Sequence, residues 1–366
     1  MLKEEKIIKL KSLSLRKLRE LCDDVQSQKS LIERQIITFS KNFTVSLSNY
    51  CQNQCGYCIY NHLVLKPGKE ENIVLIEGDE INHLIEQGLK YQCKEALLMS
   101  GENPAKFEIV RRRLKERNFN SYLDFVKKIS LNLLENNILP HTNIGSLSFN
   151  ELNELKPYNA SMGLMLESTS SKLLEKGGTH QFSPSKAPSI RLNHIKNAGK
   201  LKIPFTTGLL IGIGESFEDR IKDLFIIKNI FEEYGHIQEV ILQNFTYKEG
   251  IPYRPKYPSS VKDLLRITLI AKIIFNNEIP VQVPPNLIKG YEREFLEAGI
   301  DDFGGISPFS KDFINPEHSW PQIQELSRIC QRYGFQLKER LPVYDKFIKK
   351  RGFISENIKK KIHDII

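Results

Sequence analysis

Short apolar runs alternate with longer amphipathic segments along most of this chain. Between the runs lie stretches such as 219–234, whose apolar residues recur at helical spacing. Strands that alternate with helices of this length indicate βαβ units and a parallel sheet. The apolar runs after the first forty residues are 43–47, 95–99, 138–142, 161–166, 205–211, 239–243, 280–283 and 302–305.

Eight strands of this kind fit a closed (β/α)8 barrel of the TIM type, with 322–333 as its last helix. The first six runs are clear, whereas the last two are short and interrupted by proline or glycine. A six-stranded open barrel with a C-terminal extension is therefore the alternative. We expect an N-terminal helical extension over 1–40 that packs on the barrel, the α/β barrel itself over 41–340, and a basic C-terminal tail over 341–366.

Composition limits the classes of protein that this chain can represent. Of its 366 residues, 40% are hydrophobic and 27% are charged, which excludes a disordered chain and a membrane bundle. The longest apolar stretch, near 209–213, is much shorter than a membrane span, and the first residues lack the apolar core of a secretory signal. We therefore expect a cytoplasmic protein. Its net charge of +9 could serve nucleic acid, an anionic small molecule or solubility alone.

Three of the six cysteines form a C-x3-C-x2-C pattern, made by Cys51, Cys55 and Cys58. The pattern directly follows the first predicted strand, and a barrel of this type carries its chemistry at the carboxyl ends of the strands. Thiolates are the ligands of iron–sulfur clusters, and three of them leave one iron of a cubane open to another ligand. A zinc site completed by His62 is the alternative, because three cysteines and a histidine also form a closed set.

The cysteine loop resembles that of the radical S-adenosylmethionine (SAM) superfamily, with an aromatic residue, Tyr60, two positions beyond the last cysteine. The resemblance implies one 4Fe–4S cluster whose open iron binds SAM. It also implies that an electron from the cluster cleaves SAM and yields a 5′-deoxyadenosyl radical. A reductant such as ferredoxin or flavodoxin would supply that electron.

Polar residues at the later strand ends match the SAM-binding positions of the superfamily. Gly101 and Glu102 end the second run, where the superfamily has a glycine-rich motif that meets the methionyl amine, although Glu102 could equally cap the following turn. Glu167 ends the fourth run, where a carboxylate would reach the ribose hydroxyls or the methionyl amine. Gln243 ends the sixth run, where the adenine edge is expected.

The fifth run leads into a glycine-rich segment, TTGLLIGIGES, which resembles the adenine-side motif of the superfamily. Gly212 and Gly214 are its candidate cofactor-binding residues. The same pair could begin a dinucleotide-binding fingerprint, but Phe217 stands where that fingerprint requires its third glycine.

Longer phrases across the chain resemble one family within the superfamily. Together they are similar to the first subunit of 7,8-didemethyl-8-hydroxy-5-deazariboflavin (FO) synthase over about 40–340. Ile59, Asn103 and Ile144 depart from that family's pattern at positions that bear on substrate contacts and not on the cluster loop. The phrases are CGYC at 55–58, CKEALLMSGENP at 93–104, PHTNIGSLS at 140–148, LKPYNASMGLMLES at 155–168, QNF at 243–245, VPPNL at 283–287 and GGISPFSKDFINPEHSWP at 304–321.

The family resemblance implies a substrate, a reaction and a partner. The small-molecule substrate would be 5-amino-5-(4-hydroxybenzyl)-6-(D-ribitylimino)-5,6-dihydrouracil, supplied by the companion second subunit of FO synthase. The adenosyl radical would remove a hydrogen atom, the ring would close onto the phenol and ammonia would leave, which makes the enzyme a carbon–nitrogen lyase. His141, Asn143 and Asn286 are the candidate substrate contacts, because they offer donors and acceptors around the mouth of the barrel. For His141 a structural hydrogen bond is the alternative.

Two other functions stay open on the sequence alone. Another small-molecule radical SAM enzyme, such as the companion subunit, an aminofutalosine-pathway enzyme or a biotin-synthase relative, would share the cysteine loop, although the segment 304–321 argues against it. An RNA-binding protein would use the positive charge and the basic run 111–113, but it needs a concentrated patch with interleaved aromatic residues. The basic residues are instead spread over predicted helices, so neither nucleic acid nor a membrane is expected as a partner.

Overall fold

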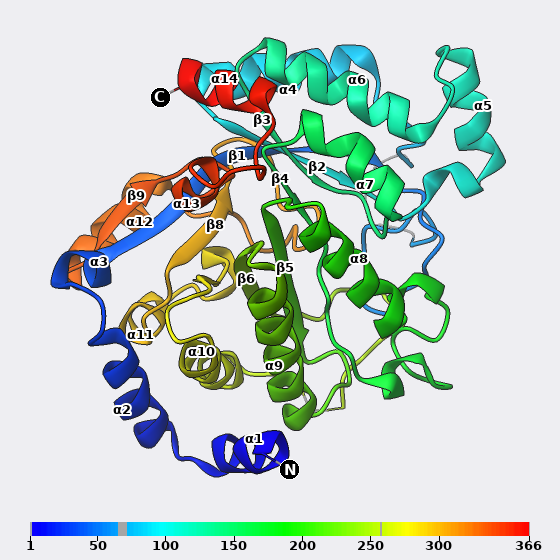
Figure 1. The fold of residues 1–366 in the computed structure, drawn as a ribbon. Coiled ribbons are helices and arrows are strands. Elements are labelled where there is room, and N and C mark those ends of the chain that lie inside the picture. The colour runs from blue at the N-terminus through cyan, green and yellow to red at the C-terminus, as the bar shows by residue number, and fades with distance from the viewer. Residues whose placement is uncertain (1, 65–71, 257, 366) are drawn as a thin grey trace.

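A computed structural model describes residues 2–64, 72–256 and 258–365 of the protein. Within these residues the centre of the fold is a barrel of parallel strands surrounded by helices (Figure 1). β1 pairs with β2 on one side and with β8 on the other, which closes the barrel. The predicted (β/α)8 barrel is confirmed, and the six-stranded alternative is wrong. The barrel strands are β1 (Ile36–Ser48), β2 (Glu95–Ser100), β3 (Leu139–Asn143), β4 (Ser161–Gly163), β5 (Phe205–Ile211), β6 (Ile237–Asn244), β7 (Val281–Gln282) and β8 (Asp302–Ile306).

β1 is much longer than its apolar run. Its first residues pair with an additional parallel strand, β9 (Gln336–Glu339), before the rest of β1 joins the barrel. The sequence pattern predicts only 43–47, because Ser40 and Asn42 are polar and interrupt the alternation. Both side chains are nevertheless buried, which a pattern based on hydrophobicity cannot anticipate.

Helices cover the outside of the barrel, and serine residues fix where several of them begin. Ser216 and Ser260 form capping boxes with Asp219 and Asp263 at the starts of α9 and α10. Because of its box, α9 starts two residues before the predicted segment 219–234. The helices of the ring are α4 (Gly78–Lys90), α5 (Glu108–Glu116), α6 (Tyr122–Glu135), α7 (Phe149–Leu155), α8 (Pro188–Lys200), α9 (Phe217–Tyr234), α10 (Val261–Phe275), α11 (Glu292–Glu297) and α12 (Ile323–Arg332). Short 3-10 turns among them are η1 (Pro104–Lys106), η2 (Lys156–Tyr158), η3 (Ser171–Leu174), η4 (Pro184–Lys186) and η5 (Pro285–Leu287).

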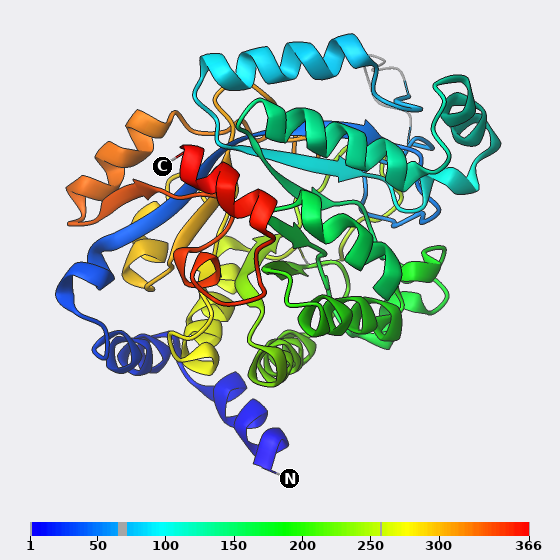
Figure 2. The same ribbon diagram turned by 45° about the horizontal axis from the view of Figure 1, so that its top comes forward.

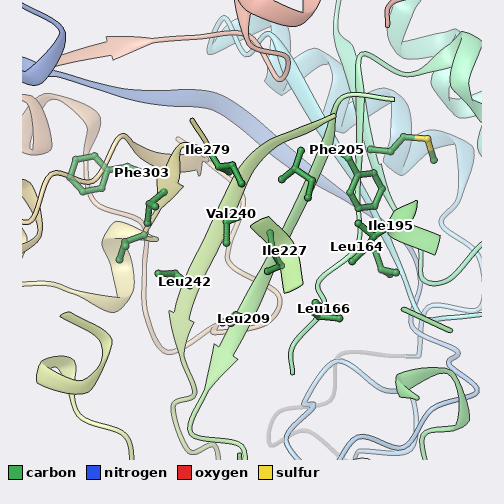
Figure 3. Close-up of a cluster of buried hydrophobic side chains, with 14 of the residues drawn as sticks. Leu164, Leu166, Ile195, Phe205, Leu209, Ile227, Val240, Leu242, Ile279 and Phe303 are labelled. Atoms are coloured by element: carbon green, nitrogen blue, oxygen red, sulfur yellow. The ribbon is translucent and has the colours of Figure 1, made fainter. Parts of the chain in front are cut away.

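The main hydrophobic core lies between the strands and the helix ring. Phe205, Val240 and Leu242 point outward from β5 and β6, and Ile227 of α9 packs in the same cluster (Figure 3). Each of these side chains is fully buried, and burial of a side chain of this size stabilises the fold by about 1.5–3 kcal/mol. Because side chains alternate along a strand, the neighbouring positions of β5 and β6 face the barrel interior.

Three N-terminal helices precede the barrel: α1 (Leu2–Ser12), α2 (Leu15–Gln26) and α3 (Leu31–Gln35). α1 contacts α9 and α2 contacts α10, so this segment lies outside the helix ring (Figure 1). Leu18 of α2 is fully buried there. After α2, Lys29 forms an ion pair of 2.7 Å with Asp301, which also pairs with the buried Lys272 of α10 at 2.6 Å.

The C-terminal segment carries two further helices, α13 (Asp345–Ile348) and α14 (Glu356–Ile365), drawn in red in Figures 1 and 2. It forms its own small core against Leu139 and Ala160, at the amino ends of β3 and β4. Lys349 and Lys350 are exposed, as expected of a basic surface tail. The apolar residues of the same segment are buried, which the description as a surface tail does not include. The segment's buried apolar residues are Leu341, Val343, Phe347, Phe353, Ile354, Ile358 and Ile362. Among the helices of the described residues, none has the length and apolar composition needed to cross a membrane.

Candidate active site

The three predicted cysteines lie on the loop after β1, at the carboxyl end of the barrel, and line one cavity. Two hydrogen bonds point at their sulfur atoms. The backbone N–H of Glu102 donates to Cys51 Sγ at 3.2 Å, and the Ser183 hydroxyl donates to Cys55 Sγ at 3.3 Å. Donors directed at cysteine sulfur are one of the means by which proteins tune iron–sulfur clusters.

Two thiols of this loop, those of Cys51 and Cys58, have raised pKa values. Burial, with a smaller contribution from the negative charge of Cys55, raises the pKa of Cys58 to about 12. Burial also raises the pKa of Cys51, against the effect of backbone amides that donate to its sulfur. A bound metal centre would reverse these raised pKa values, because its positive charge deprotonates the thiols that coordinate it.

A single-metal site does not fit this arrangement. Among the described residues, no group of three or more His, Cys, Asp or Glu side chains is arranged to hold one metal ion. His62, the proposed fourth zinc ligand, instead accepts the Cys51 backbone N–H at its Nδ1 (3.4 Å) and stacks on Tyr50, with ring centroids 4.3 Å apart. A cubane spreads its irons over several corners and holds its thiolates further apart than one ion does. With His62 engaged elsewhere, the loop offers three cysteine ligands, the number that leaves one iron of a cubane open.

Buried charged side chains face the cysteine loop across the same cavity. Glu102 Oε2 accepts a hydrogen bond from Asn53 Nδ2 at 3.1 Å and pairs with Arg191 Nη1 at 3.3 Å. Glu167 Oε1 pairs with Lys186 Nζ at 2.7 Å and lies 3.9 Å from Arg191 Nη2. Two cations and two carboxylates in one wall can bind a zwitterion such as the amino-acid portion of a ligand.

The hydrogen bonds of Glu102 show whether its side chain caps the turn that follows. The following turn, η1, has Asn103 at its N-cap with a left-handed φ of 50°, and no side chain caps it. Glu102 therefore does not act as a cap. Its buried Oε1 has no hydrogen-bond partner among the described residues, and leaving such an acceptor unpaired costs about 1–3 kcal/mol. This oxygen is available to a bound donor.

Glu167 is held in an unusual backbone conformation. Its φ of 65° lies in the left-handed region, which is rare for residues with a side chain. Asp223 of α9 secures the next two residues by accepting hydrogen bonds from the Ser168 hydroxyl at 2.8 Å and the Thr169 backbone N–H at 3.0 Å. Burial would raise the pKa of Glu167, but Lys186 and the neighbouring arginine outweigh it and lower that pKa. The side chain is thus a charged acceptor aimed into the cavity.

The three predicted glycines have different places. A Cβ at Gly101 would lie 2.2 Å from the Tyr50 carbonyl oxygen, so only glycine lets β2 end against the cysteine loop, and Gly101 lines the cavity. Gly212 and Gly214, with φ of 97° and 118°, form the turn after β5. The Gly212 N–H donates to the Glu215 carboxylate at 2.7 Å. The structure places both of these glycines outside the residues that line the cavity.

Two tyrosines of the cysteine loop line the cavity. The hydroxyl of Tyr60, the predicted one, donates to the Ser48 carbonyl at 3.0 Å and lies 2.7 Å from the Ser46 hydroxyl. Tyr57 was not predicted, and its hydroxyl lies 3.0 Å from His180 Nε2. Its position immediately before the last cysteine of the motif is the signal that could have identified it.

A second cavity continues from the first toward the amino ends of the strands. Gln243 and Asn143, both predicted, line the two cavities and so lie where they meet. His141 lies in the second cavity alone, with its Nδ1 2.6 Å from the Ser161 hydroxyl, so it makes a structural hydrogen bond and also faces the cavity. Burial lowers the pKa of His141, which keeps the ring neutral near pH 7.

Asn286, the remaining predicted contact, lines neither cavity. Its Nδ2 donates to Asp312 Oδ2 at 3.0 Å and to the His318 carbonyl at 3.1 Å, so it supports the loop after β8. That loop does reach the site, because Ile314 and Asn315 line both cavities. The structure thus brings the cysteine loop together with Glu102 and Glu167, as the sequence predicts. It adds two cations that were not predicted: Lys186, in the turn before α8, and Arg191, in the first turn of α8.

Comparison with known proteins identifies relatives of this chain. Residues 45–226 match the model of the radical SAM superfamily. The chain is 45% identical over 362 residues to the 7,8-didemethyl-8-hydroxy-5-deazariboflavin synthase of Methanococcus maripaludis, which covers 98% of this chain and 99% of that protein. It is 43% identical over 346 residues to the protein of the same name from Methanocaldococcus jannaschii, covering 94% and 93%. The solved structure of HydG, a maturase of the FeFe-hydrogenase, has the same fold, with a TM-score of 0.72 over 99% of this chain and 91% of that one at 14% identity.

Proposed function

Because this chain belongs to the 7,8-didemethyl-8-hydroxy-5-deazariboflavin (FO) synthase family of the radical SAM superfamily, we propose that it closes the deazaflavin ring of FO. The substrate is 5-amino-5-(4-hydroxybenzyl)-6-(D-ribitylimino)-5,6-dihydrouracil. One hydrogen atom is removed, a further electron and a proton are lost as the ring closes onto the phenol, and ammonia leaves, which makes the enzyme a carbon–nitrogen lyase. SAM, which ends as methionine and 5′-deoxyadenosine, would be the net oxidant. The observation that carries the proposal is the cavity that runs from the cysteine loop into a polar barrel interior.

The residues of the first cavity fit a 4Fe–4S cluster with SAM. When bound, this pair supplies the 5′-deoxyadenosyl radical. Cys51, Cys55 and Cys58 would bind three of the irons. Glu102 Oε1, which has no partner among the described residues, would accept from the methionyl ammonium, and Arg191, whose buried Nε also has none there, would bind the methionyl carboxylate.

The adenosine portion of SAM would lie further along the same cavity. Tyr57, Leu210 and Phe245 provide apolar surface there, and Asn244 has a buried Oδ1 without a partner in the described residues. These features suit the faces and the amino edge of adenine, with Gln243 beside them. Glu167 would bind the ribose hydroxyls or the methionyl amine, since its carboxylate accepts from two donors. Tyr60 and Gly101, which line this cavity, are proposed cofactor contacts on the family resemblance, whereas Gly212 and Gly214 form the turn after β5 and lie outside its lining.

The substrate would occupy the second cavity. Its reacting atoms must lie beside the adenosyl group, where Met99, Asn143 and Gln243 line both cavities. Exclusion of water there protects the radical from side reactions. We assign the companion second subunit as the source of the substrate and a ferredoxin or flavodoxin as the source of the electron.

Anaerobic reconstitution tests this function. The holoenzyme with a reductant, SAM and the synthetic adduct is expected to give 5′-deoxyadenosine, a fluorescent deazaflavin and ammonia. Formation of 5′-deoxyadenosine with a different product would assign the chain to another small-molecule radical reaction. Failure to cleave SAM at all would contradict the radical mechanism.

A further inference from the structure

The floor of the second cavity is polar, whereas barrels of this type usually fill their interior with bulky apolar side chains. The strand registers place Asn42 of β1 opposite Glu95 of β2, and Thr206 of β5 opposite Glu239 of β6. All four side chains line the cavity. Glu95, Thr206 and Glu239 lie near the amino ends of their strands, and Asn42 lies beside Glu95 in the middle of β1. Arg340, which follows β9, completes this layer. A polar layer at this depth calls for an explanation.

Most polar side chains of this layer form ion pairs or hydrogen bonds with one another. Arg340 binds Asp302 through Nε at 2.6 Å and Glu239 through Nη2 at 2.8 Å. Glu239 also accepts hydrogen bonds from the Thr206 hydroxyl at 2.9 Å and the Tyr344 hydroxyl at 3.1 Å. This network anchors the C-terminal segment to the bottom of the barrel, and its carboxylates have little capacity left for a ligand.

Glu95 differs from Glu239 in this respect. Its side chain is buried, with 7% of the residue exposed, and lines the cavity. Its Oε1 accepts a long hydrogen bond of 3.5 Å from Asn42 Nδ2. Arg340, the arginine of this layer, forms its ion pairs with Glu239 and Asp302 instead of with Glu95. A buried carboxylate with so little compensation is costly, and a ligand that donates hydrogen bonds would remove that cost.

The proposed function, on which this inference rests, determines which part of the substrate reaches Glu95. The uracil ring and the hydroxybenzyl group both take part in ring closure, so they must stay near Met99 and Gln243, where the cavities meet. The ribityl chain takes no part in the chemistry and is free to extend to the floor. Its hydroxyls are donors, and a carboxylate accepts two at once.

We propose that Glu95 binds the hydroxyl groups of the ribityl chain and thereby determines specificity for a polyol-bearing substrate. Asn42 and His141, which line the cavity beside it, complete the polyol subsite. Glu95 acts as a positioning residue, because binding of the remote chain holds the reacting ring against the adenosyl group. It takes no part in the removal of hydrogen.

The test compares two substrates in the reconstituted holoenzyme: the adduct with its ribityl chain, and an analogue that carries a methyl group in its place. In Glu95→Gln, kcat/KM for the ribityl adduct should fall by about tenfold or more, as expected for loss of a hydrogen bond to a charged group, with a fall in kcat as well as a rise in KM because the reacting ring is held less firmly. The kcat/KM for the methyl analogue should not change. The ratio of kcat/KM for the ribityl adduct to that for the analogue should therefore fall. Glu95→Asp keeps the charge and should lie between wild type and Glu95→Gln.

Controls separate this proposal from the proposed function and from misfolding. Glu86→Gln makes the same charge change on the exposed face of α4 and should behave as wild type. Cluster absorbance and SAM cleavage without substrate show whether each variant is intact. If Glu95→Gln is not intact, the same comparison is made with Glu95→Asp. An unchanged preference between the substrates in an intact variant would overturn the polyol subsite alone. Absence of deazaflavin from the wild type would overturn the proposed function, and the subsite with it.

Discussion

Arg191 Nη1 lies 3.3 Å from Glu102 Oε2, in an ion pair that is buried on both sides. The pair joins α8 to the end of β2, where Glu102 also contacts the cysteine loop, and both side chains line the cavity. A buried pair of this kind is seldom retained for stability alone, since apolar packing would serve as well. The pair lines the cavity, and Oε1 of Glu102 has no partner among the described residues. We therefore interpret the pair as part of a site for a zwitterionic ligand.

Removal of the arginine should therefore affect both stability and SAM binding. Arg191→Gln leaves the Glu102 carboxylate buried without its cation, which we expect to lower the free energy of unfolding by about 3–5 kcal/mol. SAM affinity should fall as well. Urea unfolding and equilibrium dialysis with SAM measure the two effects, and unchanged SAM affinity in the folded variant would contradict the assignment of Arg191.

Glu102→Gln keeps the size of the side chain but removes its negative charge. We expect the cluster to form normally, because the contact of residue 102 with Cys51 is made by its backbone N–H. SAM affinity should fall by about tenfold, the usual scale for loss of one charged hydrogen bond. Glu108→Gln on the exposed side of α5 is the matched control. A variant that binds SAM like wild type would show that another group meets the methionyl amine.

Gly101→Ala tests the contact between β2 and the cysteine loop. The added methyl group would lie 2.2 Å from the Tyr50 carbonyl oxygen and 2.9 Å from Cys51 Cβ, and neither can move without moving the loop. We expect the variant to lose about 1–3 kcal/mol of stability and to bind less iron per chain after reconstitution. Gly78→Ala, where a Cβ meets nothing within 4 Å, should keep full iron content. Normal cluster formation in Gly101→Ala would refute this packing role.

Asp223 gives a pH-dependent prediction. Burial raises its pKa from the usual 3.8 to about 6, although Ser168 and Thr169 donate hydrogen bonds to it. Because the folded state holds this proton more tightly than the unfolded chain, stability falls as pH rises from about 4 to 6 and then levels off. Relative to Asp223→Asn, which cannot titrate, wild type should lose about 3 kcal/mol across that range. Urea unfolding of both proteins at each pH measures it, and parallel curves would rule out the titration.

The features that could be predicted from the sequence are those confined to strand ends. The cysteine loop, Glu102 and Glu167 each follow an apolar run directly, and the barrel brings such positions together whatever lies between them. Arg191 and Lys186 escaped prediction because they belong to the start of α8 and the turn before it, where charged residues usually face solvent. Glu95 escaped for the opposite reason, since it begins a strand and lies at the far end of the barrel.

Other differences arise from tertiary contacts that no local pattern contains. Asn286 has the residue type of a substrate contact, but its amide is bound to Asp312 in the neighbouring loop. The buried side of the C-terminal segment is hidden in the sequence by the lysines that alternate with Phe347, Ile358 and Ile362. Gly212 and Gly214 match a binding motif, yet the Glu215 carboxylate accepts the N–H groups of Gly212 and Ile213.

The central claim is that the cysteine loop and the polar cavity below it form one radical active site for deazaflavin synthesis. The most direct measurement follows deazaflavin, 5′-deoxyadenosine and ammonia together after addition of the synthetic adduct under anaerobic conditions, in wild type, in Cys55→Ala and in Cys330→Ala as a control outside the site. Wild type and Cys330→Ala should form all three products, and Cys55→Ala should lose cluster and products together. A wild-type holoenzyme that cleaves SAM in the presence of the adduct but forms no deazaflavin would contradict the account.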